Sequence, residues 1–314
     1  MSAPDLRSRA LRYVALRQAL GFQSRATARL LLDFVAFAET RGQTQTPTTQ
    51  LAVDWACSHG SGRRDGARRL SVLRGFLTHL RASLPQTQIP AVGLLREARR
   101  PVPHIFSDEE IAALLRTARR LGPAGSLRPH TYATLVGLLA SSGLRIGEAV
   151  GLRIGDIRLE ATPPHLHISE SKFRKSRLVV LHPSVVTALH EYARHRERLG
   201  YNRVCDAFFV SEKPGPLPAP SARRTFAKIA RRAGVRPAIG RGAHLHDLRH
   251  TFAVRRLLLW CREGIDIRAQ LPELSVYLGH VRPADTYWYL TATPELLATA
   301  ADRFEAFVGA GGAS

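Results

Sequence analysis

The stretch HLHDLRHTFA, residues 244–253, opens a predicted helix that continues to Trp260 and places His246 and Arg249 three positions apart. Side chains three positions apart lie on the same face of a helix, so the imidazole and the guanidinium project in one direction. A guanidinium can hold two oxygens of one phosphate group, whereas an imidazole can carry a proton. The stretch therefore predicts a helix with one face suited to phosphate binding and proton transfer.

Four further motifs complete a set of six residues with related chemistry. They are SSGLRIGEAVGL at 141–152 with Arg145, SKFRKSRLVVL at 171–181 with Lys172, YLGH at 277–280 with His280, and TYWYLT at 286–291 with Tyr289. Cleavage of DNA at a phosphate requires positive charge at the non-bridging oxygens, a nucleophile in line, and a proton for the leaving 5′ oxygen. Cations and proton donors followed by a tyrosine supply all three without a metal ion.

The residue types suggest separate roles within this set. Arg145 and Arg249 are expected to clamp the phosphate oxygens, and Tyr289 is the expected nucleophile. The short strands HLHIS and RLVVL predict a hairpin with Lys172 at its tip. Lysine is suited to be the acid, because an ammonium group with a pKa of about 10 can release its proton and a guanidinium effectively cannot.

The five motifs, in this order, resemble those of the tyrosine recombinases, the phage-integrase family of site-specific DNA recombinases. GLRIGEAVGL resembles the first arginine box of the family, HDLRHTFA its HxxR box and LGH its third histidine box, while SKFRKSRLVVL resembles the hairpin with the family's lysine. Tyr289 follows His280 at the family's common interval of nine residues. The resemblance spans residues 107–291 of the catalytic part, and the N-terminal helices resemble the family's core-binding domain.

The resemblance implies a fold and an activity. The fold is mainly α with a small β-hairpin or sheet. Its parts are an α+β catalytic domain and an N-terminal helical bundle, which together form a C-shaped clamp on DNA. The activity is cleavage and rejoining of double-stranded DNA through a 3′-phosphotyrosyl intermediate, with no metal and no other cofactor, in the integration, excision or transposition of a mobile element. The implied assembly is a homotetramer on synapsed DNA. The ending TYWYLTATPELL resembles transposon-borne recombinases, which implies sibling recombinases as further partners.

Several alternatives stay open at this point. Lys175 is the second candidate for the acid, and Tyr287 is the second candidate for the nucleophile. His244, His246 and His250 could instead be zinc ligands, although no acidic or thiol ligand lies nearby at the spacing of a known motif. The same residue set also occurs in type IB topoisomerases, which nick and relax DNA, and a third possibility is a DNA-binding regulator without catalysis.

The chain divides into a helical first part and a mixed second part. Residues 1–84 are interpreted as the helical DNA-binding domain, the proline-punctuated residues 85–106 as a linker, and residues 107–310 as the catalytic domain. Thr48 or Thr49 can cap a helix, and ARRLSVLRGFLTHLRA at 67–82 carries an apolar stripe beside arginines that suit DNA phosphates. Ser107 with Glu110 predicts a capping box at the start of the catalytic part. A last helix is expected at 294–308.

Charge and cysteine content point to nucleic acid and to the cytoplasm. The chain has a formal net charge of +21, and its first hundred residues hold 16 arginines against 6 acidic residues. Such an excess of positive charge favours a polyanionic partner. The three cysteines are odd in number and widely spaced, which is typical of a reducing compartment. No apolar run reaches the length of a membrane span, and no export signal is evident.

Overall fold

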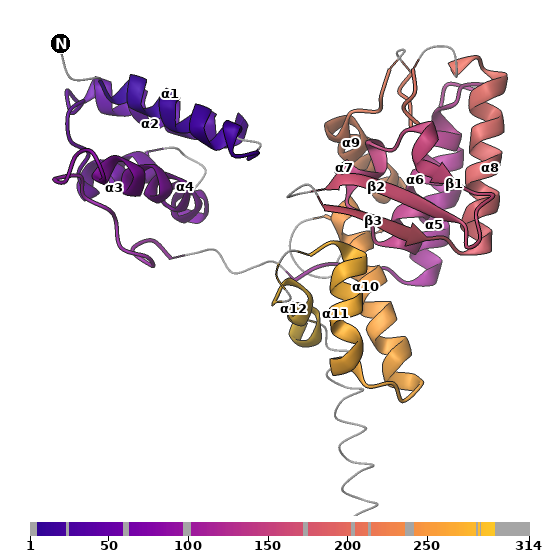
Figure 1. Ribbon diagram of the computed structural model, residues 1–314. Helices are drawn as coiled ribbons and strands as arrows, with labels where there is room; N and C mark the ends of the chain where they lie inside the picture. Colours follow the sequence, from indigo (N-terminus) through magenta and orange to yellow (C-terminus); the bar gives the residue numbers. More distant parts are fainter. Residues whose placement is uncertain are drawn as a thin grey trace, which may run out of the picture. The chain divides into compact units, whose positions relative to one another are not determined.

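The computed structural model describes residues 5–22, 25–58, 63–96, 102–171, 175–201, 205–212, 215–235, 242–280, 282 and 284–292. They belong to two compact units, Met1–Arg100 and Pro101–Ser314 (Figure 1). The helix expected at 294–308 lies outside the described residues. No helix in the described ranges is both long enough and apolar enough to cross a membrane.

The first unit consists of helices, as predicted. They are α1 (Leu6–Ala19), α2 (Arg25–Thr40), α3 (Thr49–Cys57) and α4 (Arg63–Arg81). Thr48 caps α3 by accepting a hydrogen bond from the backbone N of Leu51 at 3.2 Å. The apolar stripe predicted on α4 is the inner face of the bundle, with Leu70, Leu73, Phe76, Leu77 and Leu80 all buried.

The arginines of α4 do not all belong to one exposed basic face. Arg68 and Arg81 are exposed, but Arg69 is buried. Its guanidinium lies 5.7 Å from the ring centroid of Trp55, and its Nε donates to Asp65 at 3.2 Å. An arginine can cover an aromatic ring with its apolar faces while an acid satisfies its charge. Arg69 is therefore not exposed to DNA phosphates, contrary to the expectation for the arginines beside the apolar stripe.

The segment after α4 packs back on the first unit where the structure describes it. The Gln88 side chain accepts a hydrogen bond from the backbone N of Thr49 at 2.9 Å, and its own backbone N donates to the carbonyl of Pro47 at 3.1 Å. Ile89 and Leu95 pack against the apolar core of the unit. The predicted division of the chain thus stays a prediction from composition. It places a DNA-binding domain at 1–84, a linker at 85–106 and the catalytic domain at 107–310.

The second unit combines a helical scaffold with one small sheet. Its helices are α5 (Asp108–Arg119), α6 (Arg128–Ser142), α7 (Ile146–Val150), α8 (Pro183–Arg198), α9 (Ala219–Arg232), α10 (Leu245–Arg262), α11 (Ile267–Leu278) and α12 (Ala284–Ala292), with a 3₁₀ turn η1 (Ile154–Asp156). Helix α6 is buried and packs against α5, α8 and α10. The mainly helical fold class is as predicted. The capping box of Ser107 and Glu110 at the start of α5 is confirmed.

The sheet has the order β1–β2–β3 with antiparallel neighbours: β1 (Ile157–Arg158), β2 (His165–Ser171) and β3 (Lys175–Val180). The β2–β3 pair confirms the predicted hairpin, and β1 adds a short strand that the sequence pattern did not reveal. Along β3, Leu178 and Val180 are exposed and Val179 is buried. Because side chains alternate between the faces of a strand, Arg177 lies on the same side as Val179.

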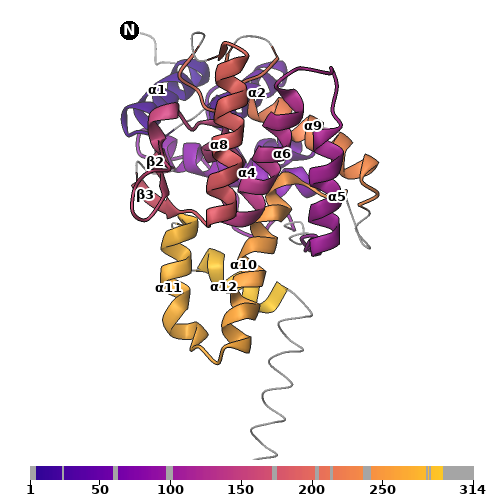
Figure 2. The ribbon, with the colours of Figure 1, turned by 90° about the vertical axis from the view of Figure 1, so that its right-hand side faces the viewer.

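Helices α10, α11 and α12 pack together at one end of the second unit (Figures 1 and 2). No helix was predicted where α11 lies, and Pro272 stands inside it. Asp266 caps its first turn by accepting from the backbone N of Arg268 at 2.8 Å, and Gly279 ends it with a φ of 66°. Residue 272 lies within the second turn, and the packing of Leu271, Leu274 and Leu278 in the core offsets the cost of the proline. This packing brings the C-terminal end of α11 beside α10 and β3.

Candidate active site

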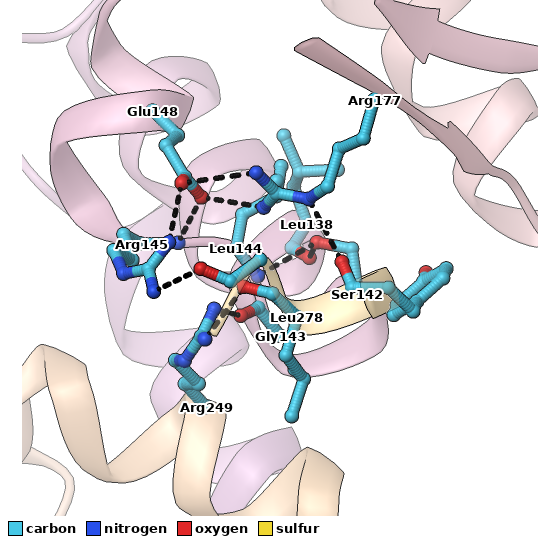
Figure 3. Close-up of polar contacts among 11 residues, drawn as sticks. Leu138, Ser142, Gly143, Leu144, Arg145, Glu148, Arg177, Arg249 and Leu278 are labelled. Atoms are coloured by element: carbon cyan, nitrogen blue, oxygen red, sulfur yellow. Dashed lines mark hydrogen bonds and ion pairs between the residues drawn. The ribbon is translucent and has the colours of Figure 1, made fainter. Parts of the chain in front are cut away.

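Three arginines meet at the C-terminal end of α11 (Figure 3). Arg177 Nε donates to the carbonyl of Tyr277 at 2.8 Å, Arg249 Nη2 to that of Leu278 at 2.6 Å, and Arg145 Nη2 to that of Gly279 at 2.6 Å. The last carbonyls of a helix lack partners within the helix and carry the negative end of its dipole. Three successive carbonyls therefore fix guanidinium groups from β3, from α10 and from the start of α7.

Arg249 is held on two sides by backbone oxygens. Besides the bond to Leu278, its Nη1 donates to the carbonyl of Gly143 at 2.7 Å, at the left-handed end of α6. The residue is 1% exposed. Burial, and then the neighbouring positive charge of Arg145, lower the pKa of Arg249 to about 10, so it keeps its charge at neutral pH. The two carbonyl partners offset part of the cost of burying this cation.

Glu148 is the shared counter-charge of the other two arginines. Its carboxylate accepts two bonds from Arg177, at 3.1 and 2.8 Å, and one from Arg145 Nη1 at 2.8 Å. It also accepts from the backbone N of Arg145 at 2.9 Å. Burial alone would raise the pKa of Glu148, but the hydrogen bonds from Arg177 and Arg145 outweigh it and leave the pKa below its usual value. Glu148 thus holds the guanidinium of Arg145.

Arg177 was not among the predicted site residues, and its place in RLVVL indicated only a strand residue. The signal was present in the alternation of β3. An arginine on the same side as a buried valine needs a partner for its charge, because an unpaired buried cation is costly. Through its bonds to Glu148 and to the Tyr277 carbonyl, Arg177 connects the hairpin with α7 and α11.

Tyr289 lies in α12 and points into this end of the unit, where it is 2% exposed. Its hydroxyl is 3.1 Å from Nδ1 of His250. The ring of His280 is stacked on the tyrosine ring, with centroids 6.2 Å apart and an angle of 19° between the planes. Tyr287 instead is 48% exposed. Tyr289, not Tyr287, is the tyrosine that the fold brings to the two histidines.

His280 follows directly after the arginine-binding end of α11. Its Nδ1 is 2.7 Å from the hydroxyl oxygen of Thr286. Burial, followed by the positive charges of Arg249 and Arg145, lowers the pKa of His280 to about 3. The imidazole is therefore neutral at physiological pH, so one ring nitrogen carries a proton and the other can accept one.

The structure brings five of the six predicted residues together, namely Arg145, His246, Arg249, His280 and Tyr289. His246 is exposed, with its ring centroid 4.6 Å from that of His250, and its charge is close enough to act on the pKa of His280. Lys172 lies outside the described residues, although β2 and β3 on either side of it belong to the sheet that Arg177 joins to the site. Where the chain is described, no three His, Cys, Asp or Glu side chains are grouped to hold a metal ion.

Comparison with known proteins identifies relatives of the whole chain. The phage integrase family matches residues 105–295. A Sinorhizobium fredii protein named as an integrase/recombinase, y4rB, is 40% identical over 300 residues, covering 93% of this chain and 95% of that protein. A structure of the Tn1549 transposon integrase in complex with transposon right end DNA shares the fold with a TM-score of 0.67 at 14% identity, covering 96% of this chain and 99% of that one. A lambda integrase tetramer bound to a Holliday junction gives 0.57 at 17% identity, covering 85% and 76%.

Proposed function

This chain belongs to the phage integrase family and is a tyrosine recombinase. From that premise we propose that it cleaves and rejoins double-stranded DNA through a covalent bond between Tyr289 and a 3′ phosphate. The observation that carries the proposal is the meeting of Arg145, Arg249, His280 and Tyr289 at the end of α11. This end provides fixed positive charge beside a phenol, which is the combination that phosphoryl transfer to a tyrosine requires.

In the proposed reaction, the Tyr289 oxygen attacks phosphorus while the bond to the 5′ oxygen breaks. Arg145 and Arg249 neutralise the non-bridging oxygens as their charge grows, and Lys172 gives its proton to the leaving 5′ oxygen. Neutral His280 is a further hydrogen-bond partner for the phosphate oxygens. Arg249 and Tyr289 are almost fully covered in this structure, so the reaction also requires that DNA binding uncovers them.

The biological role follows from the same premise. We assign the chain to the integration, excision or transposition of a mobile element, and the likeness to a transposon integrase supports this assignment. The reaction exchanges strands between two duplexes, so the assembly we expect is a homotetramer on synapsed DNA, with sibling recombinases as candidate further partners. The likeness to a lambda integrase tetramer bound to a Holliday junction supports a tetramer. Its expected place is the cytoplasm, as the cysteine content suggests.

The direct test of the proposal is a covalent adduct on nicked DNA. A suicide substrate loses a short 5′ fragment after cleavage, which prevents rejoining, so the protein should stay attached to the 3′ phosphate through denaturing electrophoresis. The adduct should form equally well in excess chelator, because arginines supply the positive charge that a metal would otherwise provide. A strict requirement for magnesium or zinc would contradict the mechanism. Relaxation of supercoiled DNA without any specific site would instead indicate a topoisomerase.

A second expected result concerns Lys172 and the leaving group. Lys172→Ala should slow cleavage of normal DNA by about a hundredfold or more, since a general acid typically contributes that much. A substrate with sulfur at the 5′ bridging position should largely restore the rate, because a thiolate leaves without a proton. Rapid-quench measurement of adduct formation on both substrates checks this. The matched control is Lys175→Ala, which should behave like wild type. Rescue of Lys175→Ala instead would move the acid to that residue.

Gly279 offers a test of the arginine arrangement itself. A Cβ at this position would lie 2.7 Å from Arg177 Nη1 and 3.2 Å from Arg145 Nη1, and the φ of +66° is unfavourable for alanine. Gly279→Ala should therefore lower the free energy of unfolding by about 1–2 kcal/mol through strain and should also slow cleavage by displacing the guanidiniums. Urea unfolding and adduct formation measure the two effects.

The matched control for this substitution is Gly200→Ala, which has a similar φ of +77° and no atom within 4 Å of the added Cβ. The Gly200→Ala protein should lose a similar free energy of unfolding but should cleave DNA at the wild-type rate. Equal cleavage rates in the two variants would mean that the packing of the arginines around Gly279 does not matter for the reaction.

A further inference from the structure

His250 follows directly after Arg249, but it is not one of the six residues with an expected catalytic role. Its side chain is buried between aromatic and imidazole rings: the centroid of His246 is 4.6 Å away, and those of Trp288 and Tyr289 are both 5.4 Å away. Its Nδ1 lies 3.1 Å from the Tyr289 hydroxyl oxygen, within the range of a direct proton transfer. His250 therefore contacts the atom that would attack the DNA.

The phenol has to lose its proton for this attack. Tyrosine has an ordinary pKa of about 10, so its hydroxyl is protonated at neutral pH and is a weak nucleophile in that form. An unprotonated imidazole nitrogen in contact with the hydroxyl can both orient it and take the proton as the new bond forms. His250 Nδ1 is in this position.

His280 is less suited to the same task, although it is also close to Tyr289. Its ring plane is nearly parallel to that of Tyr289, at an angle of 19° with the ring centroids 6.2 Å apart. Its Nδ1 is 2.7 Å from the hydroxyl oxygen of Thr286. The two Nδ1 atoms therefore have different partners: that of His250 lies against the Tyr289 oxygen, and that of His280 lies against the Thr286 oxygen.

We propose that His250 is the general base for Tyr289, which rests on the proposed function of Tyr289 as nucleophile. In cleavage, the bond between the Tyr289 oxygen and phosphorus forms, the phenol proton passes to His250 Nδ1, the bond from phosphorus to the 5′ oxygen breaks, and that oxygen takes the proton of the general acid. In rejoining, the 5′ hydroxyl attacks, the acid recovers its proton, and His250 returns the other proton to the phenol. Each proton and bond is thereby accounted for.

The test combines His250→Phe with a change in the acidity of the phenol. Phenylalanine keeps a ring among the neighbouring aromatic groups but cannot accept a proton, so adduct formation should slow by about a hundredfold or more. A polyfluorinated tyrosine placed at position 289 has a much more acidic phenol, which ionises without a base. In the His250→Phe protein, this replacement should restore most of the lost rate, because the missing proton acceptor is no longer needed.

Two further variants separate folding from chemistry. His250→Asn keeps a hydrogen-bonding group near the position of Nδ1 but is not a useful base, and it should be slow with tyrosine and restored by the fluorinated residue. His190→Phe changes an exposed histidine of α8 and should be unaffected. If His250→Phe is unstable by urea unfolding, the asparagine variant alone decides the question.

The outcomes are distinct. An adduct-formation rate within threefold of wild type in His250→Phe or His250→Asn would overturn the proposal. A slow rate that the fluorinated tyrosine does not restore would also overturn it, because His250 would then only orient or pack Tyr289. Restoration in the slow variants supports the general base. An adduct that still forms with Tyr289→Phe would contradict the proposed function itself. Peptide mapping of the protein residue linked to the DNA separates this failure from a failure of the general-base proposal.

Discussion

Tyr289→Phe should bind DNA as the wild-type protein does and form no covalent adduct. The substitution removes one oxygen atom, and without it no phosphotyrosyl bond can form. The ring still packs against His280 and Trp288, whose centroids lie 6.2 and 5.5 Å away. The loss of the hydrogen bond with His250 should change the free energy of unfolding by only about 1 kcal/mol. Electrophoresis of the denatured suicide-substrate reaction and a binding titration measure both properties.

The matched control for this substitution is Tyr287→Phe. Tyr287 lies two residues earlier in α12 but is 48% exposed, so its variant should form the adduct at the wild-type rate. The opposite pattern, in which Tyr287→Phe loses the adduct and Tyr289→Phe keeps it, would show that the exposed tyrosine is the nucleophile and that the buried one packs the site.

Arg145→Ala should slow cleavage by about a hundredfold or more while weakening DNA binding much less, because its clamp acts mainly on charge that develops in the transition state. The side chain is 28% exposed, in contrast to the buried Arg249, so it is more accessible to an incoming phosphate. Glu148 keeps its two bonds from Arg177 in the variant, which limits the damage to the fold. Single-turnover cleavage at saturating DNA, compared with a binding titration, separates the two effects.

Two other variants sharpen this result. Arg145→Lys keeps the charge, but an ammonium cannot reproduce the planar arrangement that reaches both Glu148 and the Gly279 carbonyl, so only part of the rate should return. Arg153→Ala removes an exposed arginine that pairs with the exposed Asp206 and should leave cleavage unchanged. Equal losses of binding and of cleavage rate in Arg145→Ala would make this residue a simple phosphate contact.

Features that depend on neighbours in the chain could be predicted from sequence. The capping box of Ser107 and Glu110 joins residues three positions apart, and the Thr48 cap of α3 is equally local. The β2–β3 hairpin and the apolar stripe of α4 follow from periods of two and of about 3.6 residues. The candidate residues were identified in the same way, because each lies in a short motif whose residue types fit one reaction.

The predictions failed where a long-range contact overrode the local pattern. Arg69 repeats the spacing of an exposed basic face, but it packs against the ring of Trp55 from α3 while Asp65, one turn earlier in α4, pairs with its charge. Helix α11 was not among the predicted elements; it contains a proline, which disfavours a helix, yet burial of its leucines keeps the helix intact. In both cases the energy of tertiary packing exceeds the local preference, which amounts to only a few kcal/mol at most (about 3 for a proline).

The sequence by itself therefore determined the helical class, the hairpin and the identity of the candidate residues, since these depend on residue type and short spacing. Only the tertiary structure decided which side chains support them. Arg177 lies 100 positions from the carbonyl it binds, Arg145 lies 134 positions from Gly279, and His250 lies 39 positions from Tyr289. No periodic pattern encodes such contacts. They arise because the end of α11 offers three carbonyls in a row, and the packing of α7, α10, α12 and β3 around it brings the charges and the phenol to one place.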